Sequence, residues 1–247
     1  MIDEGKLSKV ILRDLKPRLV EPHIYTLNST DDIDSGYDVW GGVYDLVACN
    51  RLYNRLIWGY WVSEYHAFCY DALNASSTGW VLDAGCGSLA FTAGTYLKYS
   101  ERPVVLMDNS IKMLKLAKSR LIKLNGKVPD NMVFLHGDVL QLPFKSKSFG
   151  TIVSLNVLHA VEEAKKMLQG MQFVLHDGGV MSLTTLVENK RYADRYLRKL
   201  GEAGALVSRS SNQLITLFSE LDIPVNYKLI GNLAFINSGN DSNYVTA

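Results

Sequence analysis

The chain has few cysteines, almost no net charge and no long apolar segment. Its 247 residues include three cysteines, 26 basic residues and 25 acidic residues, which gives a net charge of +1. Three cysteines without metal-ligand spacing argue against a disulfide framework and against a metal site, and the balanced charge lacks the basic excess of a nucleic-acid-binding protein. No apolar run is long enough to span a bilayer, and no basic region followed by an apolar core opens the chain. We therefore expect a cytoplasmic protein with no membrane span, no nucleic-acid partner and no metal.

What the chain does contain is a short apolar run that ends in an acid and turns through two glycines. The segment Trp80–Ser88 places Asp83 just before Gly85 and Gly87. A parallel α/β sheet presents a nucleotide-like ligand in this way, at the carboxyl end of a strand. Glycine lets the backbone approach the ligand closely and adopt the torsions of the turn. A glycine pair alone can also be a plain strand-to-helix turn, so other residues must support a ligand site.

From Trp80 onward, apolar runs of strand length alternate with helical periods. The runs cover residues 80–84, 104–107, 132–135, 151–155 and 179–183. Apolar strands separated by helices indicate a parallel sheet with helices on both faces. Two final runs, 225–230 and 233–236, are joined by Gly231-Asn232, which favours a two-residue hairpin turn. We therefore expect a seven-stranded, mostly parallel sheet that ends in an antiparallel pair.

The residues ahead of this pattern differ in composition. Residues 1–36 suggest only a short helix around Leu7–Leu15, whereas aromatic residues crowd positions 37–70. In this aromatic stretch, helical spacing is shown by Trp61, Tyr65, Phe68, Cys69 and Ala72. This spacing predicts an amphipathic helix.

Further polar residues follow the later strands. Asp108 ends the second run, where a carboxylate can bind ribose hydroxyls or cap the next helix together with Ser110. Gly137-Asp138 follows the third run, and its carboxylate and backbone amides could bind an adenine edge. The fourth run ends in Ser154–His159, which such a sheet places beside the glycine loop.

In this order the motifs resemble those of class I S-adenosylmethionine-dependent methyltransferases. Within that superfamily the chain is most similar to the small-molecule branch related to quinone-biosynthesis C-methyltransferases. The resemblance covers about residues 78–185 and implies a Rossmann-like α/β domain over 77–247, with a helical insertion at about 187–222. Residues 1–76 would then form an N-terminal extension and an aromatic-rich helical cap. The motifs are Val81–Gly87, Met107-Asp108, Gly137-Asp138 with Leu142-Pro143-Phe144, Asn156–His159 and Asp177–Gly179.

The resemblance also implies which residues hold S-adenosylmethionine, whose product is S-adenosylhomocysteine. Asp83 and the glycine loop would hold the methionine end, and Asp108 would bind the ribose. Asp138 would accept a hydrogen bond from the adenine amino group. The expected cofactor-binding residues are Asp83, Gly85, Cys86, Gly87, Asp108, Asn109, Gly137, Asp138, Val139, Leu155 and Asn156. Two positions depart from the family, because Leu89 replaces a frequent glycine and Gly150 replaces a frequent acid.

Catalysis and substrate binding are less clearly marked. His159 is the candidate base, since imidazole titrates near neutral pH, and a packing role is its alternative. A pocket for a small-molecule acceptor, methylated on oxygen, nitrogen or carbon, would be lined by Tyr44, Trp58, Tyr192 and Tyr196.

Two other functions fit parts of the pattern. A nicotinamide-dependent oxidoreductase would explain the glycine turn and Asp108, but it leaves Asp83, Asp138 and the final hairpin unexplained. A relative that keeps the cofactor site without methylating, as a binding partner or a cyclase, is not excluded by these residues.

Overall fold

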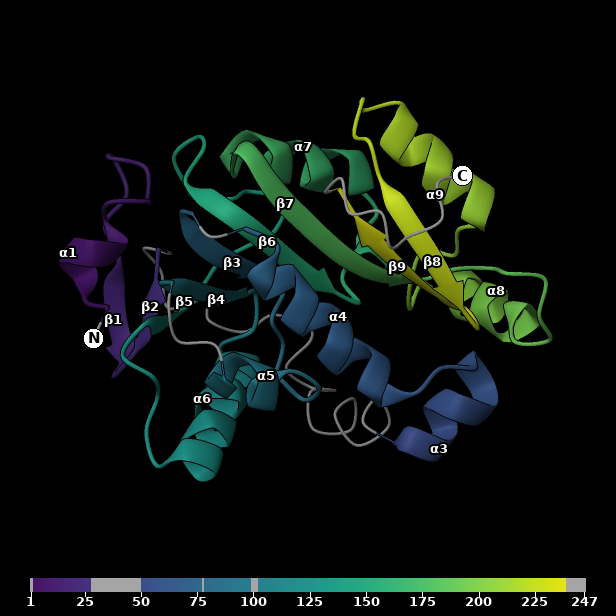
Figure 1. Ribbon diagram of the computed structural model, residues 1–247, viewed down its shortest axis with the longest axis horizontal. Helices are drawn as coiled ribbons and strands as arrows, with labels where there is room; N and C mark the ends of the chain where they lie inside the picture. The colour runs from purple at the N-terminus through teal and green to yellow at the C-terminus, as the bar shows by residue number, and fades with distance from the viewer. Residues whose placement is uncertain (1, 28–49, 77, 99–101, 239–247) are drawn as a thin grey trace.

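The computed structural model describes residues 2–27, 50–76, 78–98 and 102–238, which form one sheet flanked by helices (Figure 1). Its strand order in this part of the chain is β1-β2-β5-β4-β3-β6-β7-β9-β8. The strands are β1 (Arg18–Glu21), β2 (Ile24–Thr26), β3 (Trp80–Ala84), β4 (Val104–Asp108), β5 (Met132–His136), β6 (Phe149–Leu155), β7 (Leu175–Leu186), β8 (Asn226–Ile230) and β9 (Leu233–Asn237).

The sheet confirms the predicted fold class and extends it. The five neighbouring strands β5, β4, β3, β6 and β7 run parallel. Strand β9 lies antiparallel between β7 and β8. Seven strands were expected, but the described chain has nine, because β2 pairs parallel with β5 and β1 pairs antiparallel with β2. The helix expected around Leu7–Leu15 is limited to α1 (Glu4–Leu7), since Ile11 forms a β-bridge with Phe144 beyond it.

Helices cover both faces of the sheet. In Figure 1, α7 and α9 lie above the sheet, and α4, α5 and α6 lie on its other side. No helix in the described ranges is both long and apolar enough to cross a membrane. The helices are α3 (Arg51–Tyr53), η2 (Asn54–Trp58), α4 (Val62–Asn74), α5 (Ala93–Lys98), α6 (Ile111–Asn125), η3 (Leu158–Ala160), α7 (Ala164–Val174), α8 (Asp194–Glu202) and α9 (Ser211–Ser219).

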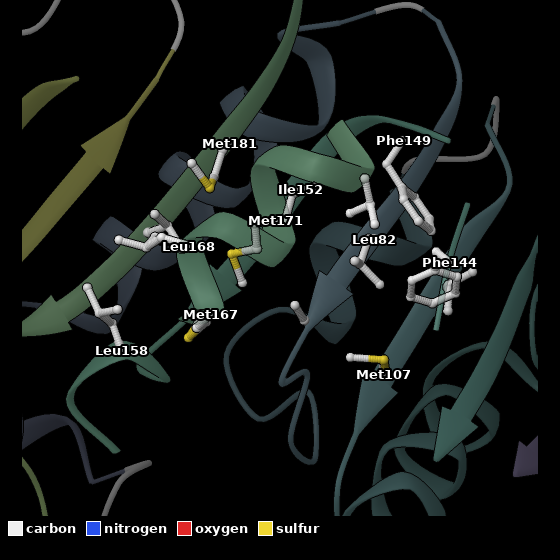
Figure 2. Close-up of a cluster of buried hydrophobic side chains, with 14 of the residues drawn as sticks. Leu82, Met107, Phe144, Phe149, Ile152, Leu158, Met167, Leu168, Met171 and Met181 are labelled. Atoms are coloured by element: carbon white, nitrogen blue, oxygen red, sulfur yellow. The ribbon is translucent and has the colours of Figure 1, made fainter. Parts of the chain in front are cut away.

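The alternation of side chains along the strands decides which residues face which layer. Leu82 packs toward α7, as Figure 2 shows, whereas Val81 packs toward α4 and α5. Because strand side chains alternate between the two faces, Asp83 faces the same side as Val81. Asp108 shares that side with Leu106 of β4. The two acids at the strand ends therefore lie on the face covered by α4, α5 and α6.

We call the helices α3, η2 and α4 the cap helices, or the cap, and an aromatic cluster joins them to the final hairpin. Trp58 and Tyr65 pack in one buried cluster with Phe235 of β9. The hairpin turn fits closely against the cap, because the backbone N–H of Asn232 donates to the carbonyl oxygen of Trp58 at 2.7 Å. A Cβ added to Gly231 would lie 2.0 Å from that same oxygen. Only a glycine fits at this turn.

Candidate active site

The carboxyl ends of β3, β4, β5 and β6 lie at one edge of the sheet, because these strands run parallel. The loop after β3 bends over the end of β4. Backbone N–H groups of Gly85 and Cys86 both donate to the carbonyl oxygen of Met107, at 2.8 and 2.9 Å. Arg120 of α6 binds the carbonyl oxygen of Ser88 and donates to its hydroxyl at 2.9 Å. The loop is thus fixed by neighbours on two elements.

The glycines of this loop have different tasks. Gly85 has φ +83°, and an added Cβ would lie 2.4 Å from Cγ2 of Val157, so packing requires glycine here. Gly87 has φ +54°, and an added Cβ would meet nothing within 4 Å. The backbone therefore faces open space at Gly87, as a loop that binds a ligand through its main chain must do. Leu89, which replaces a glycine that is frequent in the family, also has a left-handed φ of +55°. The loop therefore keeps the backbone conformation that a glycine would allow here.

Asp108 ties the loop to the start of α6. Its Oδ2 accepts from the backbone N–H of Gly87 at 2.8 Å, and its Oδ1 accepts from the N–H of Ser110 at 2.9 Å. Ser110 in turn caps α6. Ligand binding and helix capping are therefore compatible roles, since each carboxylate oxygen can accept more than one hydrogen bond.

Asp83 is almost fully buried at the end of β3. The hydroxyl of Tyr96, on α5, donates to its Oδ2 at 2.7 Å. Burial raises the pKa of Asp83 to about 7, and the charge of Asp108 acts in the same direction, whereas the Tyr96 hydrogen bond lowers it. Such a carboxylate gains most from a cationic ligand group.

Asn109 lies exposed after β4, and its backbone is held by a buried histidine. Nε2 of His136 lies 3.1 Å from the carbonyl oxygen of Asn109, and Nδ1 lies 3.0 Å from Oγ1 of Thr26. A carbonyl only accepts, so Nε2 donates to Asn109, and Nδ1 shares a hydrogen bond with the Thr26 hydroxyl. This relay links the loop after β4 to the additional strand β2.

The loop after β5 lies next to Asp108. The backbone N–H of Gly137 donates to the Asp108 carbonyl oxygen at 3.0 Å. Asp138 is exposed, and its carboxylate accepts from the N–H of Leu140 at 2.8 Å. Val139 is half-buried against the core. These residues share the strand-end edge with the glycine loop, as the sequence predicts.

At the end of β6, Leu155 is half-buried and Asn156 adopts a left-handed φ of +61°. Oδ1 of Asn156 accepts from the hydroxyl of Tyr65 at 2.8 Å, and Tyr65 stacks on Phe91 with 5.0 Å between ring centroids. The sequence places Tyr65 on the buried stripe of a helix but gives no sign of this hydrogen bond. The sequence also gives no sign of the contact between Tyr96 and Asp83.

Gly150, the second departure from the family, has a steric cause. A Cβ there would lie 1.8 Å from the carbonyl oxygen of Thr78. That oxygen accepts from Arg102 at 2.6 Å, and Arg102 also donates to Oγ1 of Thr151 at 2.7 Å. A larger residue at position 150 would displace this buried arginine network.

His159 is buried in η3 and its ring is already engaged. Nδ1 accepts from the backbone N–H of Leu186 at 3.2 Å and lies 3.3 Å from Oγ1 of Thr185. Burial, with the nearby charge of Arg209, lowers the pKa of His159 to about 4. A neutral ring whose acceptor nitrogen binds the backbone is suited to packing rather than to proton abstraction.

Three of the four expected pocket residues come together where the cap meets α8. Trp58 stacks on Tyr196 with ring centroids 5.6 Å apart, and the Tyr192 hydroxyl binds the carbonyl oxygen of Leu56. Trp58 is buried, whereas Tyr192 and Tyr196 are exposed. Tyr44 lies outside the described residues. Within the described ranges, no group of three or more His, Cys, Asp or Glu could hold a metal ion.

The fold is that of class I S-adenosylmethionine-dependent methyltransferases. The methyltransferase domain family matches residues 75–218, more than half of the chain. The chain therefore belongs to the methyltransferase domain family.

Individual relatives are distant. The chain is 29% identical over 109 residues to the reducing polyketide synthase Preu2 of Preussia isomera, covering 44% of this chain and 5% of that protein. It is 23% identical over 171 residues to 27-O-demethylrifamycin SV methyltransferase of Amycolatopsis mediterranei, covering 64% of this chain and 59% of that protein. The chain thus spans less than two thirds of either relative.

A solved structure shows the same fold. Geranyl diphosphate C-methyltransferase from Streptomyces coelicolor, in complex with Mg²⁺, geranyl-S-thiolodiphosphate and S-adenosylhomocysteine, matches with a TM-score of 0.56. The identity is 14%, and the match covers 71% of this chain and 74% of that one.

Proposed function

We propose that the protein transfers a methyl group from S-adenosylmethionine to a small-molecule acceptor. The observation that carries this proposal is the hydrogen bond between the Asp108 carboxylate and the backbone N–H of Gly87 in the glycine loop. The space next to Gly87 is open, because an added Cβ there would meet nothing within 4 Å. Family membership gives the reaction class. Residues 77–247 would form the catalytic domain, to which residues 1–76 add the cap and two edge strands.

The cofactor contacts follow from the positions of the strand ends. Asp83 would bind the ammonium group of the methionine part, beside the backbone from Gly85 to Gly87, with Cys86 between them. Asp108 would accept from the ribose hydroxyls. The adenine would lie between Asn109 and the loop Gly137–Val139, with its amino group toward Asp138. Leu155 and Asn156 would close the site under the sulfonium.

The bound cofactor supplies a methyl group on an activated sulfonium, so the chain mainly aligns the acceptor and excludes water. Tyr65 fixes the side chain of Asn156, and its stack with Phe91 closes the cap over this edge of the sheet. For His159 we propose a structural role, because its acceptor nitrogen already binds the backbone of Leu186. An acceptor that needs deprotonation would require another group.

The acceptor would be a small and partly apolar molecule. Tyr192 and Tyr196 are exposed side chains next to the cap, with Tyr44 and Trp58 as further candidates. The names of the rifamycin and geranyl diphosphate methyltransferases indicate small-molecule acceptors for those proteins. The methylated atom would be oxygen, nitrogen or carbon, and the chain would belong to the small-molecule branch related to quinone-biosynthesis C-methyltransferases.

Calorimetry with S-adenosylmethionine, S-adenosylhomocysteine and NADH tests the cofactor, and labelled donor with a panel of acceptors tests transfer. We expect binding of both sulfur compounds, none of NADH, and label in a product. Binding of NADH alone would indicate an oxidoreductase. Binding of the sulfur compounds without transfer to any acceptor would favour a non-methylating relative.

Asp108→Ala should weaken S-adenosylhomocysteine binding by about 1.5–3 kcal/mol, because it removes charge-assisted hydrogen bonds. Asp130→Ala is the matched control, since that exposed carboxylate pairs only with Lys127 among the ion pairs of the described residues. Equal affinities of the two variants in calorimetry would contradict the ribose assignment.

A further inference from the structure

Asp83 is a buried carboxylate that no cation balances in the described part of the chain. Its side chain is 98% buried, since 2% remains exposed. Oδ2 accepts from Tyr96, and no described residue makes a hydrogen bond to Oδ1. An ionised carboxylate is costly to bury without a partner. The unused oxygen therefore marks a place for a cationic ligand group.

The groups packed around Asp83 add no positive charge. They are the Asp108 carboxylate on β4, the Cys86 thiol in the glycine loop, the Cys69 thiol on α4 and the Tyr96 phenol on α5. Tyr96 is fully buried and keeps its proton, because burial and the charge of Asp83 raise its pKa far above the ordinary value. It therefore acts only as a donor, which fixes the orientation of the carboxylate.

Resting on the proposed function, we propose that Tyr96 is a positioning residue that directs Oδ1 of Asp83 toward the ammonium group of the cofactor, so that binding releases the Asp83 proton. In this step Asp83 changes from carboxylic acid to carboxylate, the ammonium keeps its three protons, and one proton passes to the buffer. The raised pKa of Asp83, about 7, places this exchange in the neutral range. Tyr96 favours the ionised product because it donates to the carboxylate.

The experiment is calorimetry of S-adenosylhomocysteine binding from pH 5.5 to 7.5, in two buffers with different ionisation enthalpies. The ligand amine stays charged in this range, because it belongs to a free amino acid whose neighbouring carboxylate makes it more basic than a peptide α-amino group. Wild-type protein should release nearly one proton per ligand at pH 5.5 and clearly less at pH 7.5. 5′-Methylthioadenosine, which lacks the amino group, should release none. Asp83→Asn should abolish the proton release.

Tyr96→Phe keeps the buried ring and removes the donor. Without the hydrogen bond the pKa of Asp83 rises, so at pH 7.5 the variant should release clearly more protons per ligand than the wild-type protein does. For a rise of one pKa unit, affinity for S-adenosylhomocysteine should fall about tenfold at pH 5.5 and by less at pH 7.5, whereas affinity for 5′-methylthioadenosine should not change. Tyr60→Phe is the matched control, because it removes a buried hydroxyl that donates to Asn54 at 2.9 Å in the cap.

The outcomes separate the two proposals. An unchanged pH profile in Tyr96→Phe would overturn the positioning role. Equal loss of both ligands in that variant would also overturn it, because it would show a general loss of structure. Failure of the wild-type protein to bind either compound would overturn the proposed function itself.

Discussion

Single residues at the strand ends serve the loop and the proposed ligand together. Asp108 binds backbone N–H groups of Gly87 and Ser110 through different oxygens, and Asn156 is held by Tyr65 in a left-handed conformation. The motif residues were predicted from the sequence because they follow apolar strands directly. Their partners were not, since a helical period gives the buried face of Tyr65 but not the atom that its hydroxyl meets, and no pattern singled out Tyr96.

Leu89 carries a conformation that normally favours glycine. Its φ is +55° and its side chain is buried. Glycine is ordinarily less stabilising than alanine, but the left-handed region costs a non-glycine residue about 1–2 kcal/mol. We therefore expect Leu89→Gly to be at least as stable as Leu89→Ala in urea unfolding. A clear advantage for alanine would contradict a strained loop.

His159 gives a prediction with a defined sign in pH. Its folded pKa of about 4 lies below the ordinary value of 6.5, so the unfolded chain binds more protons between these values. Stability should therefore fall as the pH drops from 6.5 to 4. His159→Asn, whose amide oxygen can still accept from Leu186, should keep turnover and lose part of this acid dependence. Loss of turnover in a stable Asn variant would instead support a catalytic base.

Among the elements, the strands followed by helices were predictable and the first two strands were not. Runs such as Val104–Met107 are apolar and buried throughout, because helices cover both faces. By contrast, β1 and β2 have four and three residues, and β1 is partly exposed at the sheet edge. Such short segments show no period. The helix predicted around Leu7–Leu15 was wrong beyond Leu7, because pairing with the segment at Phe144 outweighs local preference.

The junction of cap and final hairpin can be tested with paired glycines. Gly231 and Gly126 both have positive φ, but an added Cβ meets the Trp58 carbonyl oxygen at 2.0 Å only at Gly231. Gly126→Ala should cost about 1–2 kcal/mol from backbone strain alone. Gly231→Ala should cost at least about 2 kcal/mol more in urea unfolding, since buried backbone must move. Similar losses of stability in the two variants would show that the cap can shift to make room for the added Cβ.

For the whole molecule, the site joins segments that are far apart in the chain, so a ligand bound there should stabilise all of it. A ligand at one hundred times its Kd adds about 2.7 kcal/mol, which corresponds to roughly 5–10 °C in Tm for a chain of this size. Thermal melts with S-adenosylhomocysteine should show this shift, and melts with NADH should not. An equal shift with both would contradict the proposed cofactor.

The relay from Thr26 through His136 to Asn109 gives the added edge strands a meaning beyond sheet extension. Through His136, strand β2 is connected by hydrogen bonds to the loop after β4, which we propose to bind the adenine. Fusions or deletions at the start of the chain are therefore not neutral for protein engineering. Without β2, Nδ1 of His136 at the end of β5 would lose its Thr26 partner.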